Sequence, residues 1–288
     1  MTYCFFNKNN SIDIHAMRDQ ISLIKQLGSN GIACLGLATE VNKLDFIEKK
    51  KIIELVAEFS NDNLPIVITI SGKNIKEYKK LIELAQFYDA SWIVFQPMLK
   101  KNSTDKDCFN FFNKILGLVE TKTLVGIQNA KEYIGVGLDS PEIIKLYNKF
   151  NNFRAIKGET SAILIQKEIV KYPKNLKVFN GRGGLEIIDN FLAGCSGIIP
   201  SLEGTDIFLK IYKLIQKNKI IEARTIYKKI LPSIVFSMQS IDSLVCYGKR
   251  ICAYRMGINK IHDRNPGLTP TNFGIKLAKE FAKDLGKF

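Results

Sequence analysis

Short apolar runs and longer segments with helical apolar spacing alternate along the chain. Between residues 13 and 27, the apolar residues Ile14, Met17, Ile21 and Ile24 recur at steps of three and four, which predicts an amphipathic helix. Short runs that are wholly apolar predict strands buried on both faces of a parallel sheet. Eight such strands are expected, at residues 3–6, 31–36, 66–70, 92–95, 124–128, 153–157, 176–180 and 197–200.

The order of these elements predicts the fold class. Eight strand–helix units within about 215 residues favour an α/β fold of the closed (β/α)8 type, a TIM barrel, over an open sheet. We expect the barrel to occupy residues 1–217. Residues 218–288 lack strand patterns and predict a C-terminal helical extension, with helices at 220–231, 234–256 and 273–288 and a break at Pro232.

Composition excludes several classes of function. The net charge of +14 comes from 35 Lys and only 7 Arg spread over the whole length, with no nucleic-acid motif, so no nucleic-acid partner is expected. The two histidines supply no metal site. The six cysteines have no CxxC spacing and predict buried thiols in a reducing compartment. No apolar run approaches the ~20 residues of a membrane span, so we expect a cytoplasmic protein.

Lys157 stands at the end of the predicted strand 153–157, where alternation places it on the same side as Phe153, Ala155 and Glu159. A lysine among apolar neighbours can lose its proton and attack a carbonyl group to form a Schiff base. The alternative is a lysine whose stem is buried and whose ammonium reaches solvent.

The loops that follow the strands of a barrel lie on one rim, where such barrels hold their active sites. The residues expected there are Thr39, Glu40, Gln96, Gln128, Asn129, Lys157, Glu159, Gly181, Arg182, Ser201 and Glu203. This set suits a carbonyl substrate that carries a carboxylate. Structural alternatives remain: Glu40 could pair with a lysine, Gln128 and Asn129 could cap loops, and the turn 180–184 could need glycine for its conformation alone.

Five segments resemble the Schiff-base lyase family of dihydrodipicolinate synthase and N-acetylneuraminate lyase. They are Gly31–Gly36 with Glu40, Pro65–Gly72, Ile156–Thr160, Phe179–Gly184 and Gly194–Ser201, in the family's order, and they cover about residues 10–215. The resemblance implies that Lys157 is the Schiff-base residue. It also implies a homo-oligomer, a dimer or a tetramer.

The chain departs from the family at its proton-transfer residues. The family's Gly-Thr-Thr-Gly-Glu is Gly36-Leu37-Ala38-Thr39-Glu40 here, and its Tyr-Asn pair is Gln128-Asn129. Gln128 cannot titrate, so other groups must move protons. The candidates are Glu159 and Tyr133, with Glu40 and Glu203 as weaker ones. Tyr133 falls where some family members carry an arginine that binds a carboxylate.

The sequence therefore predicts a lyase, an aldolase or dehydratase, that acts on pyruvate or a 2-keto-3-deoxy acid through a Lys157 imine without a cofactor. A first alternative is a barrel that binds a 2-oxo acid without catalysis, because the tyrosine is missing. A second is a sugar-phosphate enzyme in which the turn Gly181–Gly184 holds a phosphate.

Overall fold

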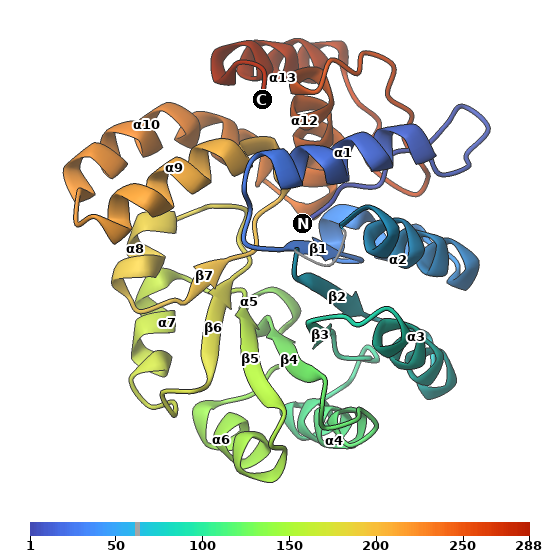
Figure 1. The fold of residues 1–288 in the computed structure, drawn as a ribbon, viewed down its shortest axis with the longest axis vertical. Helices are drawn as coiled ribbons and strands as arrows, with labels where there is room; N and C mark the ends of the chain where they lie inside the picture. Colours follow the sequence, from blue (N-terminus) through green and yellow to red (C-terminus); the bar gives the residue numbers. More distant parts are fainter. Residues whose placement is uncertain (61–63) are drawn as a thin grey trace. The chain divides into compact units, whose positions relative to one another are not determined.

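The computed structural model describes residues 1–60 and 64–288 and divides into two compact units (Figure 1). Unit 1 comprises Met1–Pro65, Gly183–Ile188 and Pro200–Phe288, and unit 2 comprises Ile66–Arg182 and Asp189–Ile199. The predicted boundary between the barrel and the extension, at residues 217 and 218, stays a prediction.

Unit 2 contains six parallel strands that neighbour one another in chain order (Figure 1). They are β2 (Ile66–Ile70), β3 (Trp92–Phe95), β4 (Leu124–Asn129), β5 (Phe153–Gly158), β6 (Lys177–Asn180) and β7 (Gly197–Ile198). The helices between β2 and β6 are α3 (Ile75–Phe87), α4 (Asp105–Leu116), α5 (Lys131–Ile134), α6 (Ser140–Lys149) and α7 (Ala162–Ile169). Because all six strands run the same way, their carboxyl ends share one edge of the sheet, as the sequence predicts.

The sheet of unit 2 is curled. The rings of Trp92 on β3 and Phe179 on β6 lie 5.1 Å apart between centroids, although β4 and β5 separate these strands in the sheet. Two side chains can meet across two intervening strands only on the concave side of a curved sheet. Lys157 pairs in register with Phe179, so both side chains point to this side.

Polar residues fix where the helices of unit 2 begin. Asn74 caps α3, Ser161 caps α7, and Thr104 forms a reciprocal capping box with Asp107 at α4. At α6 the N-terminal cap is Asp139. The Asp139 carboxylate forms a second capping box, and Ser140 takes the first helical position.

In its described residues, unit 1 holds one strand and most of the longer helices. Its strand is β1 (Ile32–Cys34), and its α-helices are α1 (Ile14–Gln26), α2 (Phe46–Ser60), α9 (Thr205–Gln216), α10 (Ile220–Ser237), α11 (Ile241–Ser243), α12 (Lys249–Arg255) and α13 (Asn272–Leu285). Short 3₁₀ helices lie at Leu37–Thr39, Val41–Lys43 and Leu202–Gly204, and a π-helix lies at Leu244–Gly248. Helix α8 (Ile187–Leu192) begins in unit 1 and ends in unit 2.

Three expectations about unit 1 are wrong. The segment Tyr3–Phe6 is buried but is not a strand, because Phe6 makes only isolated bridges to Ile12 and His262. Helix α10 runs through Pro232 without a break, since one missing backbone donor does not end a helix whose neighbours stay packed. The expected helix at 234–256 is divided, because α10 ends at Ser237 and Ser240 caps a new start.

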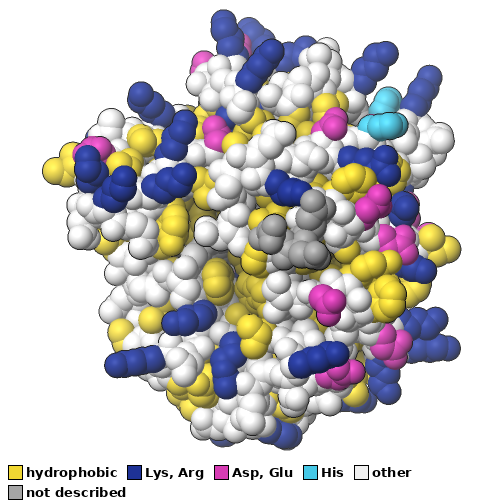
Figure 2. Space-filling model, viewed as in Figure 1, with side chains coloured by type: hydrophobic (Ala, Val, Ile, Leu, Met, Phe, Trp, Pro, Cys, Tyr) yellow, Lys and Arg dark blue, Asp and Glu magenta, His cyan; other side chains and the backbone are white. Residues whose placement is uncertain are grey.

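The distribution of surface charge and the state of the cysteines agree with what the sequence predicts. On the face shown in Figure 2, Lys and Arg side chains are scattered rather than gathered in one patch. All six cysteines are free and buried, as expected. In the described part of the chain, no single helix is long and apolar enough to span a membrane; α10 and Ile241–Arg255 meet that test only together, as a pair bent by 108°.

Candidate active site

Three polar side chains lie in a row across neighbouring strands of unit 2. Gln128 on β4 pairs in register with Lys157 on β5, and Gln96 directly follows β3. Gln128 and Lys157 are each 5% exposed. Period-two alternation places all three on the concave side of the sheet, so a buried polar row lies at the carboxyl edge.

Lys157 and Glu159 are in direct contact. The Lys157 Nζ donates a hydrogen bond to Glu159 Oε1, and both side chains are buried. Glu159 follows the last residue of β5, and its backbone N–H donates to the Asn129 carbonyl at 3.0 Å. The sequence-based placement of the two side chains on one side is confirmed. A buried ammonium is thus balanced by one carboxylate that can take its proton.

Hydrogen bonds between amide side chains extend the contact. Gln96 Nε2 donates to Gln128 Oε1 at 2.9 Å, and Gln128 Nε2 donates to Glu159 Oε1 at 3.0 Å. The four residues form one continuous network of three hydrogen bonds. Sequence reasoning placed Gln96 at the rim but gave it no role, because its partner depends on how two strands are paired.

Gly181 makes room for the carboxylate. A Cβ built at this position would overlap with the Glu159 side chain. Gly181 follows β6, and its N–H donates to the Gly158 carbonyl at 3.0 Å. A larger residue here would therefore displace the Glu159 carboxylate from its present position.

Other predicted site residues of unit 2 have different partners. The Arg182 Nε donates to the Tyr133 hydroxyl at 3.1 Å, and Tyr133 is 55% exposed on α5. Asn129 is occupied on both ends of its amide, donating to the Leu138 carbonyl at 2.9 Å and accepting from the Leu138 N–H at 3.0 Å. Tyr133 and Arg182 thus form an outer pair, and Asn129 holds the loop that follows α5.

Glu40 lies in unit 1, in a left-handed conformation with φ of 58°. Its carboxylate accepts from Lys249 Nζ at 2.6 Å and from Lys43 Nζ at 2.7 Å, and Lys249 is fully buried. The structure therefore supports the alternative in which Glu40 pairs with lysine. Sequence reasoning missed Lys249, although a lysine inside an otherwise buried run is a signal that a carboxylate partner exists.

The remaining candidates in unit 1 form a second buried group. Glu203 accepts hydrogen bonds from the Tyr3 hydroxyl at 2.7 Å and the Ser201 hydroxyl at 2.8 Å. Burial raises the pKa of the Glu203 carboxyl above its usual value. Thr39 donates to the Thr2 carbonyl at 2.7 Å. These contacts are all internal to unit 1.

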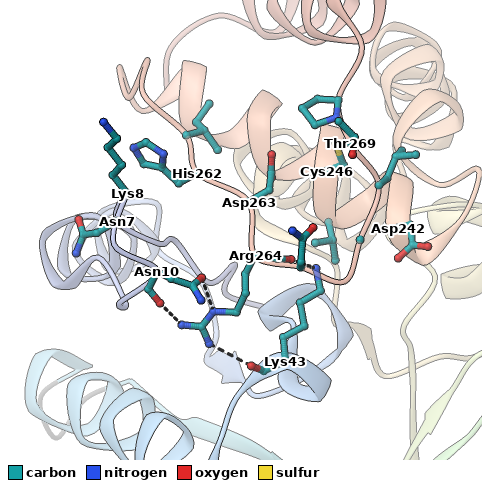
Figure 3. A pocket seen from close by; sticks show the side chains of 16 residues that line it. Asn7, Lys8, Asn10, Lys43, Asp242, Cys246, His262, Asp263, Arg264 and Thr269 are labelled. Atoms are coloured by element: carbon teal, nitrogen blue, oxygen red, sulfur yellow. Dashed lines mark hydrogen bonds between the residues drawn. The ribbon is translucent and has the colours of Figure 1, made fainter.

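Unit 1 also contains an open pocket of about 520 Å³ (Figure 3). Arg264 and Lys43 line it, but both are already engaged: Arg264 donates to Asn10 Oδ1 at 3.0 Å and to the Lys43 carbonyl at 3.1 Å, and Lys43 donates to Glu40. Across the described residues, no group of three or more His, Cys, Asp or Glu could hold a metal ion.

Comparison with known proteins identifies the family. Residues 2–278 match the model of the Dihydrodipicolinate synthetase family. The chain belongs to this family. It is 27% identical over 233 residues to the 4-hydroxy-tetrahydrodipicolinate synthase of Karelsulcia muelleri (strain GWSS), which covers 78% of this chain and 76% of that protein.

Solved structures of the family have the same fold. A sialic acid aldolase from Ruminococcus gnavus superposes with a TM-score of 0.89 at 18% identity, over 98% of this chain and 94% of the other. YagE is a prophage protein of the dihydrodipicolinic acid synthase family from E. coli K12, solved in complex with pyruvate. It superposes with a TM-score of 0.88 at 17% identity, over 98% of this chain and 96% of the other. The predicted family, its barrel fold with a C-terminal helical part, and a lyase as the class of enzyme are confirmed.

Proposed function

We propose that this member of the dihydrodipicolinate synthetase family is a lyase that binds pyruvate, or a 2-oxo acid that contains it, as an imine of Lys157. The observation that carries the proposal is the buried contact between the Lys157 ammonium and Glu159. Family membership supports it, as do a structural relative described as a sialic acid aldolase and another solved with pyruvate.

Glu159 supplies the proton acceptor that imine formation needs. Lysine attacks a carbonyl only as the neutral amine, so the Nζ first transfers a proton to the carboxylate. The amine then adds to C2 of the 2-oxo acid, and the new hydroxyl group leaves as water after Glu159 returns the proton. Ammonium and ketone thus give a protonated imine and one water molecule, and the charge is conserved.

The same pair accounts for cleavage of a longer substrate. In the imine of a 2-keto-3-deoxy acid, loss of the C4 hydroxyl proton to Glu159 breaks the C3–C4 bond. The bonding electrons move to the imine nitrogen, which gives an enamine and releases an aldehyde. Protonation at C3 and hydrolysis then release pyruvate. Gln128 donates a hydrogen bond to Glu159 throughout, and it transfers no proton.

Arg182 and Tyr133 are the proposed contacts for the substrate carboxylate. A guanidinium group matches a carboxylate in charge and geometry, and Arg182 is already oriented by the Tyr133 hydroxyl. We propose no cofactor, a cytoplasmic location and a homo-oligomer. A family structure described as a monomeric dihydrodipicolinate synthase variant means that assembly needs its own measurement.

Turnover of a panel of 2-keto-3-deoxy acids tests the function. Wild-type protein should release pyruvate from at least one acid, and Lys157→Ala should release none. Thermal stabilisation by pyruvate without turnover of any panel member would instead favour a barrel that binds 2-oxo acids without catalysis.

A further inference from the structure

Gln96 begins the hydrogen-bond network that runs through Gln128 to Glu159 and Lys157. We propose that Gln96 is a positioning residue: it fixes the direction of the Gln128 amide and so keeps a hydrogen-bond donor directed at the Glu159 carboxylate, the proposed proton acceptor. The inference rests on the proposed imine chemistry of Lys157. It assigns a role to Gln96 beside Gln128, which stands where the family has a tyrosine.

The two ends of an amide group differ in what they can bind. A glutamine side chain has an oxygen that only accepts and an NH₂ group that only donates. The Gln96 NH₂ donates to Gln128 Oε1, so the Gln128 NH₂ must face Glu159, to which it donates at 3.0 Å. A donor that faces a carboxylate stabilises its charged form. If the Gln128 amide were reversed, its oxygen would face Glu159 and favour the protonated acid.

Gln96 is itself held from two other elements. Its N–H donates to the Ile70 carbonyl at the end of β2 at 3.0 Å. Its carbonyl accepts from the Tyr78 hydroxyl of α3 at 2.8 Å. Burial raises the pKa of Tyr78, so the phenol stays protonated and remains a donor. The backbone of Gln96 is therefore anchored independently of the side chain that orients Gln128.

The groups around Glu159 are few. From β5 it faces the titratable Lys157, and from β4 it faces the neutral Gln128. After β6 it lies over Gly181, which has no side chain. Arg182, the next residue, is engaged by Tyr133. Because the Gln128 amide is one of these groups, reversing its direction would change the polar surroundings of the carboxylate.

Replacement of Gln96 by an acceptor tests the proposal. In Gln96→Glu, the new carboxylate needs the Gln128 NH₂ group, so the amide turns and presents its oxygen to Glu159. We expect the rate at which borohydride traps pyruvate on Lys157 to require higher pH, with the profile displaced by about one pH unit or more. Gln86→Glu, on α3 in the same unit, is the matched control and should leave the profile in place.

A double-mutant cycle separates the turn of the amide from the added charge. In a Gln128→Met background, Gln96→Glu should displace the profile less than in wild type, because no amide remains to be turned. An equal displacement in both backgrounds, or a Gln96→Glu profile that matches wild type, would overturn the proposal.

A second variant covers the case in which Gln96→Glu does not fold. Gln96→Met adds no charge and removes the donor to Gln128, so we expect slower trapping at neutral pH. In turnover of a 2-keto-3-deoxy acid, KM should change by less than kcat. A wild-type trapping rate in this variant would also overturn the proposal. If wild-type protein itself forms no adduct, the proposed function fails instead, which is a distinct result.

Discussion

The Lys157 ammonium donates its hydrogen bond to Glu159, two residues further along the chain and just past the end of β5, and both side chains are less than a tenth exposed. A buried ion pair contributes little net stability, because the loss of hydration offsets much of the attraction. Such a pair is instead well suited to hold a proton that moves between its two members.

Removal of the carboxylate should slow imine formation without unfolding the protein. Glu159→Gln keeps the size of the side chain and loses the proton acceptor, so the rate of borohydride trapping should fall by about 10²–10⁴-fold. Glu159→Asp should recover part of the rate. Glu132→Gln, an exposed carboxylate on α5, is the control and should trap at the wild-type rate. Trapping by Glu159→Gln at that same rate would exclude Glu159 as the base.

The buried contact of Glu40 with Lys249 should matter for stability. Lys249→Met leaves Glu40 with Lys43 as its described cationic partner and should lower the free energy of unfolding by roughly 3–5 kcal/mol. Adding Glu40→Gln should restore part of this loss. Urea denaturation measures both effects. The exposed pair Lys276–Glu280, 3.9 Å apart, is the control: Lys276→Met should change stability by less than about 1 kcal/mol.

Glu203 should make stability depend on pH. Because burial raises its pKa in the folded state, folded protein keeps this proton at pH values where the unfolded chain has lost it. Its contribution is therefore fully present below the unfolded pKa and is lost as pH rises through the folded pKa. The free energy of unfolding should fall over this window in wild type and stay flatter in Glu203→Gln. Parallel curves for the two proteins would show that Glu203 does not titrate there.

Period and order in the sequence were enough to predict much of the fold. Parallel strands such as 66–70 and 124–128 are short and apolar, and alternation alone places Lys157 beside Glu159. Partners that come from distant segments could not be predicted in this way. Glu40 and Lys249 are 209 residues apart, and Gln96 reaches Gln128 only because β3 pairs with β4. Tyr3–Phe6 looks like a strand because burial, and not pairing, makes a run apolar.

Trapping of the imine tests the central claim most directly. Wild-type protein is incubated with pyruvate, reduced with borohydride and digested, and the added mass is located by peptide sequencing. The account predicts one pyruvate-derived adduct on Lys157 and none in Lys157→Ala. No adduct in wild type, or an adduct that persists in Lys157→Ala, would contradict it.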